Sequence, residues 1–320
     1  MTTGKAYPVN LVHPVKKTVT TDIRQMDRRT LLAAGATFVT LAAAPSFADD
    51  TLGDLTIVVM DPLAAPLSCP CVKGYAQRKY ETLAEYLQKE LGMKVKLEFS
   101  ESLRTALKEK TKGKADLVIG KHSVVNFDAK EMKRQFDNVA MLTGKDGGTT
   151  QYGIVVVKSS DKAKDLADLK GYRIFFGNEE SREKHDAAIE LFKKAGVELP
   201  VKLETASACD EGCTKILEFP SGEHGAAVIS SYAKPLLEGC GTVQKGDLRV
   251  VGETADVPFV GAFVRSDLPA ELKQKLTQAL LEVGKDAKLK TALETKDGFV
   301  TVEAAAKKKT LRILSTNITP

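Results

Sequence analysis

The sequence predicts a two-lobe α/β fold in which each lobe is a mostly parallel sheet flanked by helices. Apolar, strand-like runs alternate with amphipathic helical stretches in two successive blocks. A polar, glycine-rich stretch at 143–150 separates the blocks. The chain has 320 residues and 43% hydrophobic content, which is enough for two ordinary cores.

The first 48 residues predict a leader. Arg28-Arg29 begins a basic segment, an apolar run of about 14 residues follows from Leu31 to Ala44, and Ser46 and Ala48 supply the small residues that signal peptidase requires. The run is shorter than the roughly 20 residues that cross a bilayer. We expect a signal peptide cleaved after Ala48. The paired arginines resemble a twin-arginine signal, with Sec export as the open alternative, and Met26 is an alternative start.

The leader also accounts for most of the charge. The whole chain carries a formal net charge of +5, and the segment 1–48 holds six lysines and arginines against two aspartates. The remainder is nearly neutral, so the sequence predicts no nucleic-acid partner. We expect no transmembrane segment in the mature chain.

The first block predicts alternating strands and helices. In order, the expected elements are a strand at Leu55–Met60, a helix at Ala76–Leu91, a strand at Val95–Phe99, a helix at Leu103–Lys112 and a strand at Leu117–Ile119. In an open sheet of this kind, ligands meet the carboxyl ends of the strands. A long extended run at Tyr152–Val157 then predicts the first crossing between lobes.

The second block repeats the pattern and the chain then returns. The expected elements are strands at Arg173–Phe176, Val201–Thr205, Ala226–Ile229, Leu248–Val251 and Val257–Val264, and helices at Ser181–Ala195, Tyr232–Leu237 and Pro269–Val283. The predicted organisation is a leader at 1–48, one lobe at 49–150 plus 255–320, and a second lobe at 151–254. Two crossings predict a hinged cleft that encloses a ligand.

Motifs of the common enzyme classes are absent from the sequence. There is no phosphate-binding P-loop, no nucleophile elbow, no His-Glu-x-x-His and no dinucleotide fingerprint after a strand. We therefore predict that the protein is not an enzyme. Its unassigned thiols keep catalysis as a third hypothesis.

Several short sequence segments resemble those of a known family. They are Tyr80–Leu87, Lys114–Val118, Asp168–Gly177, Val257–Val260 and Arg265–Lys273. In this order they resemble the phosphate, phosphite and phosphonate substrate-binding proteins of ABC transporters, from about Leu55 to Leu311. The resemblance implies a type II periplasmic-binding-protein fold, an exported protein without a cofactor, and delivery of a small oxyanion to a membrane permease.

The resemblance also implies a ligand site. Members of that family hold an oxyanion with hydroxyls and backbone amides at helix starts. The candidate ligand-binding residues are Ser68, Lys121, His122, Tyr152, Ser181, Arg182, His185, Ser230, Ser231 and Tyr232. The chain departs from the family pattern at Glu179 and Glu180, whose charges would repel a phosphonate ahead of Ser181.

The cysteines support two further hypotheses, a metal site and disulfide bonds. Cys69 and Cys71 follow the first strand and, with His122 and perhaps His185, form a candidate site for Cu or Zn on the same fold, in a metal-handling or redox-partner protein. An oxidising compartment instead favours disulfides, with Cys209 and Cys213 as the expected pair. Cys240, Cys69 and Cys71 are alternative partners, and five cysteines leave one unpaired.

Overall fold

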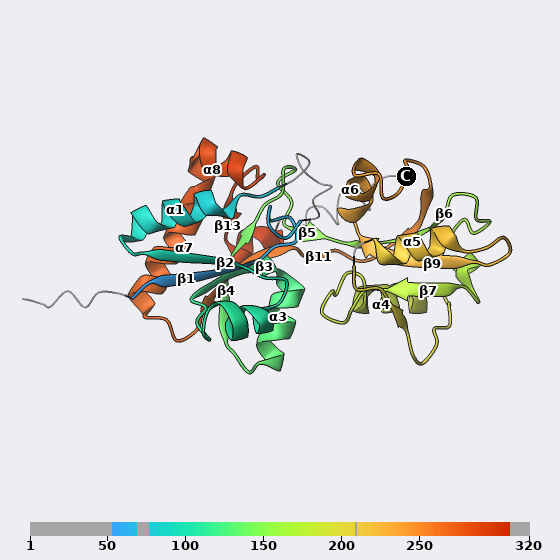
Figure 1. The fold of residues 1–320 in the computed structure, drawn as a ribbon, viewed down its shortest axis with the longest axis horizontal. Helices are drawn as coiled ribbons and strands as arrows, with labels where there is room; N and C mark the ends of the chain where they lie inside the picture. Colours follow the sequence, from blue (N-terminus) through green and yellow to red (C-terminus); the bar gives the residue numbers. More distant parts are fainter. Residues whose placement is uncertain (1–52, 69–76, 209, 308–320) are drawn as a thin grey trace, which may run out of the picture. The chain divides into compact units, whose positions relative to one another are not determined.

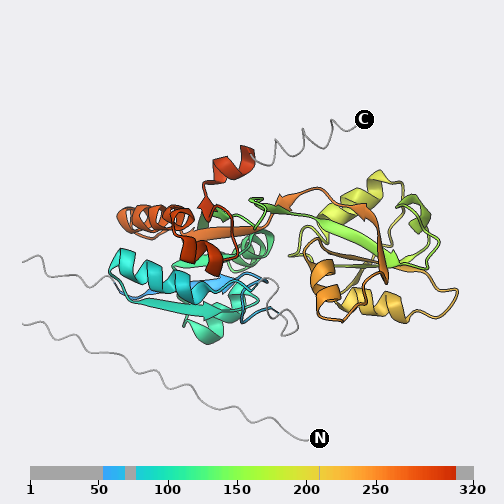
Figure 2. The same ribbon diagram turned by 90° about the horizontal axis from the view of Figure 1, so that it is seen from above.

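The described part of the chain has a mixed α/β fold (Figures 1 and 2). Its strands form a six-stranded sheet, a five-stranded sheet and a two-stranded ribbon. The structure is a computed structural model that describes residues 53–68, 77–208 and 210–307. The predicted leader, including the cleavage position after Ala48, lies outside the described residues, as do Cys69, Cys71 and Cys209.

The six-stranded sheet has the order β13-β4-β12-β3-β1-β2. Its strands are β1 (Leu55–Met60), β2 (Val95–Phe99), β3 (Leu117–Lys121), β4 (Phe136–Leu142), β12 (Val260–Arg265) and β13 (Phe299–Val300). β1 pairs in parallel with β2 and β3, whereas β12 is antiparallel to β3 and β4. The sheet is therefore mixed rather than mostly parallel, because β12 enters it from the returning chain and runs the opposite way.

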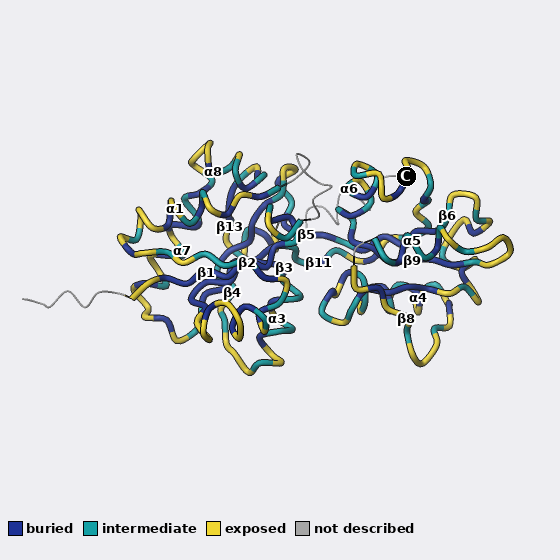
Figure 3. Tube along the Cα trace, in the orientation of Figure 1, coloured by how far each residue is buried: buried dark blue, intermediate teal, exposed yellow. Residues whose placement is uncertain are grey.

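Helices cover both faces of this sheet (Figure 1). The helices α1 (Tyr80–Leu91), α7 (Ala270–Glu282) and α8 (Ala287–Ala292) pack on one face, and α2 (Leu103–Thr105), the π-helical turn Ala106–Lys110 and α3 (His122–Glu131) pack on the other. β1 is buried along its whole length (Figure 3). Its Ile57 and Val59 join the α1 core while Val58 and Met60 join the α3 core, as strand alternation requires.

The five-stranded sheet has the order β10-β6-β9-β7-β8. Its strands are β6 (Gly153–Lys158), β7 (Arg173–Phe176), β8 (Glu204–Thr205), β9 (Gly225–Ser230) and β10 (Leu248–Glu253). α4 (Asp186–Lys194) contributes Phe192 to the core on one face, and α5 (Glu211–Glu218) with α6 (Ala233–Gly239) covers the other. β7 pairs in parallel with β8 and β9, and β6 is antiparallel to both of its neighbours.

Two chain crossings lie side by side. β5 (Thr150–Gln151) pairs antiparallel with β11 (Val257–Pro258). β5 leads directly into β6 of the smaller sheet, and β11 leads directly into β12 of the larger one. These paired segments connect the two sheets.

The structure differs from the sequence prediction at several elements. The helix predicted from Ser181 begins only at Asp186, and the strand predicted at 201–205 is reduced to β8. The predicted strand 257–264 is divided between β11 and β12. β4, α3, α5 and α8 were not predicted. No helix among the described residues combines the length and the apolar character that a membrane span needs.

Candidate functional site

Polar side chains from the two sheets meet at the ends of β3 and β9. Lys121 is the last residue of β3 and Ser230 is the last residue of β9. Between them lies the carboxylate of Glu183, from the segment that follows β7. Lys121 Nζ donates to Glu183 Oε1 at 2.6 Å, and Ser230 Oγ donates to the same oxygen at 2.6 Å. Lys121 Nζ also donates to Ser181 Oγ at 3.1 Å.

The four residues of this cluster are all buried: Lys121, Ser181, Glu183 and Ser230. Glu183 has 0% and Lys121 6% relative exposure. Burial lowers the pKa of Lys121, and the charge of Glu183 partly opposes that effect. Burial acts to raise the pKa of Glu183, but the charge of Lys121 and the hydrogen bonds from Lys121 and Ser230 outweigh it, so this pKa lies below its usual value. Glu183 is therefore ionised at neutral pH.

Hydrogen bonds hold the backbone of Glu183 in place. Lys184 N donates to Ser181 O at 2.9 Å and Gly177 N donates to Lys184 O at 3.1 Å, so residues 177–185 close on themselves as turns. Thr254 Oγ1 donates to Glu183 O at 3.3 Å. Glu183 is thus positioned by contacts within its own loop and by the segment that follows β10.

A cavity of about 200 Å³ lies beside two other predicted residues, Ser231 and Tyr232. The Tyr232 ring stacks on Phe259 with 5.2 Å between centroids, and the Arg78 guanidinium lies 5.6 Å from the Phe259 centroid. Gln151 also lines this cavity, and both polar atoms of its side chain are buried and have no hydrogen-bond partner in the described part of the chain. The cavity offers an aromatic wall and an unused amide to a ligand.

Arg78 belongs to a second buried polar cluster, with Asp61 and Tyr80. Arg78 Nη1 lies 2.8 Å from Asp61 Oδ2, and Tyr80 Oη donates to the same oxygen at 2.6 Å. Leu63 N donates to Asp61 Oδ1 at 2.9 Å. Burial and the charge of Asp61 raise the pKa of Tyr80 well above its usual value. Since Asp61 balances Arg78, this cluster fixes the turn after β1 rather than presenting a free cation to the cavity.

His122 and Arg182 lie near each other but outside the Glu183 cluster. His122 begins α3, its backbone N donates to Phe259 O at 2.6 Å, and its ring lies 5.3 Å from the Phe263 ring. Burial, followed by the charge of Arg182, lowers the pKa of His122. Arg182 is exposed, and its backbone N donates to Ser123 Oγ at 3.4 Å.

The other predicted contacts have local partners. His185 precedes α4 instead of lying one turn inside it, and its Nδ1 is 2.9 Å from Asp186 Oδ1. Ser68 Oγ donates to Ala65 O at 3.2 Å within a turn. Tyr152 packs against the smaller core, and its carbonyl accepts from Ser231 N at 2.8 Å. The structure therefore gathers Lys121, Ser181 and Ser230, and it leaves Ser68 in a structural role.

The hypothetical Cu or Zn site lies only partly within the described residues. Cys69 and Cys71 lie outside the described residues, and within the described ranges no group of three His, Cys, Asp or Glu side chains could hold a metal ion. His122 contacts Asn126 instead. Cys213 is buried in α5, and its predicted disulfide partner Cys209 is also outside the described residues. The metal-handling alternative has no support from this part of the chain.

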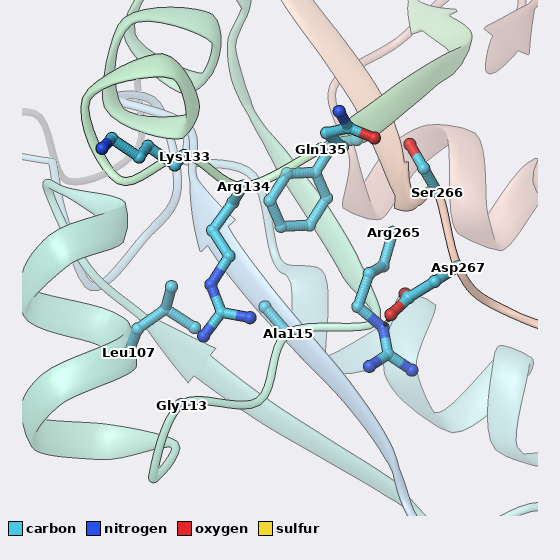
Figure 4. A pocket seen from close by; sticks show the side chains of 10 residues that line it. Leu107, Gly113, Ala115, Lys133, Arg134, Gln135, Arg265, Ser266 and Asp267 are labelled. Carbon is cyan, nitrogen blue, oxygen red and sulfur yellow. Dashed lines mark ion pairs between the residues drawn. The ribbon is translucent and has the colours of Figure 1, made fainter.

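Figure 4 shows a separate hollow of about 270 Å³. Its lining includes Ala115, which precedes β3, so it lies at the opposite end of that strand from Lys121. Arg134, Arg265 and Asp267 line it. Arg265 is balanced by Asp116 at 3.3 Å and by Asp267 at 3.1 Å. This hollow is therefore not continuous with the strand ends at which the Glu183 cluster lies.

Comparison with known families decides the identity. Residues 74–309 match the family described as ABC transporter, phosphonate, periplasmic substrate-binding protein. The chain belongs to this family. The match covers more than half of the sequence, so the predicted family is confirmed. As a member of this periplasmic family, the phosphonate-binding-family protein is exported and serves a transporter with a small-molecule ligand.

Solved structures agree on the fold. PhnD1 from Prochlorococcus marinus in complex with methylphosphonate has a TM-score of 0.58 at 16% identity, covering 80% of this chain and 97% of that one. The binding-protein component of an ABC phosphonate transporter from Pseudomonas aeruginosa has a TM-score of 0.57 at 16% identity, with 82% and 87% covered. A Xanthomonas citri protein bound to ATP has a TM-score of 0.60 at 15% identity, with 81% and 94% covered.

These similarities confirm the predicted type II periplasmic-binding-protein fold. No match is found among curated proteins.

Sequence reasoning missed Glu183, Asp61 and Arg78. Asp61 carries a signal that could have been used, because it directly follows the apolar strand Leu55–Met60. Glu183 offered no comparable signal, since it stands in a charged stretch that resembles an exposed helix start.

Proposed function

We propose that this phosphonate-binding-family protein captures a small oxyanion, such as phosphonate, phosphite or phosphate, and passes it to an ABC-transporter permease. The observation that carries the proposal is the convergence of Lys121 and Ser230 on one carboxylate, with Ser181 Oγ accepting a further hydrogen bond from Lys121 Nζ. An ammonium and a hydroxyl directed at one buried position, with a second hydroxyl beside the ammonium, form a site for an oxyanion, since charge-assisted hydrogen bonds are the strong ones.

The family argues against chemistry on the ligand. The family that matches the chain is described as a periplasmic substrate-binding protein, and that description names no reaction. We infer a binding protein rather than an enzyme, and a site that works without a cofactor. Transfer to the permease completes the function that the family implies.

Calorimetric titration with methylphosphonate, phosphite, phosphate and sulfate tests the proposal. We expect Lys121→Met and Ser230→Ala to weaken binding of the preferred anion, and the lysine change to do so about tenfold or more, because hydrogen bonds to charged groups contribute roughly 1.5–3 kcal/mol. Lys130→Met removes an exposed lysine from α3 and serves as the matched control. Unchanged affinity in both site variants would exclude this oxyanion site.

We also infer that export uses the leader, with cleavage after Ala48 and either a twin-arginine or a Sec route. The support is the order of basic, apolar and small residues in 1–48. Mass spectrometry of the mature protein from the periplasm tests the cleavage position. A mature chain beginning elsewhere would contradict the prediction.

The cysteine predictions complete the proposal. A disulfide between Cys209 and Cys213 is supported by their spacing and by the oxidising compartment in which the family works. Peptide mapping under non-reducing conditions tests that bond. The Cys69 and Cys71 site for Cu or Zn is tested by titrating the reduced protein with each metal, and it requires binding that Cys69→Ser with Cys71→Ser abolishes.

A further inference from the structure

The position that the proposed function gives to an oxyanion is already filled by the protein's own Glu183. Its carboxylate accepts from Lys121, the last residue of β3, and from Ser230, the last residue of β9. The anion that links the larger sheet to the smaller one is therefore an internal side chain. Both partners and the carboxylate itself are buried.

An external oxyanion cannot simply join this arrangement. A serine hydroxyl carries one proton, and Ser230 donates it to Glu183 Oε1. A ligand can accept a hydrogen bond from Ser230 only after the bond from Ser230 to Glu183 has broken. A second anion on Lys121 would also lie within a few ångströms of the Glu183 carboxylate, where two like charges repel. Capture on these donors therefore requires exchange of one anion for another.

The structure allows such an exchange. Glu183 Oε2 is buried and has no hydrogen-bond partner among the residues that the structure describes, so within them the internal carboxylate uses only one of its two oxygens. A phosphonate has three oxygens with which to accept from Lys121, Ser230 and Ser181. The backbone of Glu183 is fixed by Thr254, which leaves rotation of the side chain as the movement that vacates the site.

We infer that Glu183 is an internal counter-anion that sets the affinity and selectivity of the site, and that an incoming oxyanion binds by displacing its carboxylate from Lys121 and Ser230. This inference rests on the proposed function. The ligand class that it defines is a compact oxyanion with more than two acceptor oxygens, because a simple monocarboxylate would only replace the contacts that Glu183 already makes.

Titration of Glu183→Gln with methylphosphonate tests the inference. We expect this variant to bind methylphosphonate at least about tenfold more tightly than the wild type, since the neutral amide competes less well for Lys121. Glu179→Gln removes the same charge from an exposed position of the same loop and is the matched control, expected to bind like the wild type. Equal or weaker binding by Glu183→Gln would overturn the inference.

The outcomes separate this inference from the function on which it rests. If Lys121→Met loses binding while Glu183→Gln gains none, the oxyanion site stands and the displacement does not. If Lys121→Met and Ser230→Ala both bind like the wild type, the proposed site itself is wrong.

Chemical rescue supplies a second readout that does not depend on the glutamine variant. In Glu183→Ala, acetate can fill the vacated position, so added acetate should raise the melting temperature of this variant and should leave that of Glu179→Ala unchanged. A crystal structure of the wild type with methylphosphonate gives the direct result. Glu183 still bonded to Lys121 beside the bound ligand would overturn the inference.

Discussion

Gly153 lies directly against the backbone of Glu183. A Cβ atom at position 153 would stand 2.2 Å from the Glu183 carbonyl oxygen, a separation that real Cβ atoms do not show. Thr254 Oγ1 joins the two residues, because it accepts from Gly153 N at 2.7 Å and donates to Glu183 O at 3.3 Å. The first residue of β6 thus determines how closely the Glu183 loop can approach.

Gly153→Ala should therefore displace the Glu183 loop and destabilise the protein. The contact is with backbone, which has little room to move, so we expect a loss of about 1–3 kcal/mol in the free energy of unfolding, as for other overpacked sites. Urea denaturation measures it. Gly53→Ala is the control, since a Cβ there would meet no atom of the described residues within 4 Å. Equal stability of the two variants would contradict the proposed role of Gly153.

The strands show how much of the fold could be predicted from sequence. β1, β2 and β7 have the predicted bounds because they are short apolar or alternating runs that end in polar or glycine residues. The helix predicted from Ser181 was placed too early. Residues 181–185 instead form turns, and one of their bonds comes from Thr254, 71 positions away from Glu183. Local periodicity carries no information about such a contact.

The site could be predicted only in part for the same reason. Lys121 and Ser230 could be named as candidates from the sequence because they stand at the ends of predicted strands, which is where α/β sheets bind ligands. Glu183 was missed because its burial depends on partners 62 and 47 positions distant. A glutamate among other charged residues reads as exposed until those partners are known.

The Asp61 cluster predicts a large effect of one isosteric change. Asp61→Asn keeps the shape of the side chain but leaves Arg78 buried without its counter-ion, and breaking a buried pair in this way costs roughly 3–5 kcal/mol. Chemical denaturation should show this loss. Glu204→Gln, which breaks an exposed pair with Arg173, should change stability little. A similar effect for both variants would show that the Asp61 cluster is not a structural anchor.

The cavity beside Tyr232 predicts discrimination among phosphonates. Tyr232 and Phe259 form its aromatic wall, so an organic substituent on the ligand can pack there while the oxyanion lies elsewhere. Tyr232→Ala should weaken binding of phenylphosphonate more than binding of phosphite, which has no substituent. Competition titrations with both anions measure the ratio. A loss of equal size for the two ligands would mean that the cavity holds no part of the substituent.

Acid should weaken the link between Lys121 and Glu183. The folded-state pKa of Glu183 lies below its usual 4.5, despite burial, because Lys121 and Ser230 favour the ionised form. A carboxylate with a depressed pKa contributes stability that is fully present above its unfolded pKa and is lost as pH falls through its folded pKa. The wild type should therefore exceed Glu183→Gln in unfolding free energy by more at about pH 7 than at about pH 3.

Denaturation of both proteins across this pH range isolates the effect of one residue. Other carboxylates also titrate in this range. One is Glu211, because hydrogen bonds from Lys215 and Ser207 lower its pKa to about 2. These groups are common to both proteins, so their effects cancel in the difference. Glu179→Gln makes the same change at an exposed position of the same loop and is the matched control. If the difference for Glu183→Gln varies no more with pH than that of this control, Glu183 is not held as an anion by Lys121, and displacement by an external oxyanion loses its physical basis.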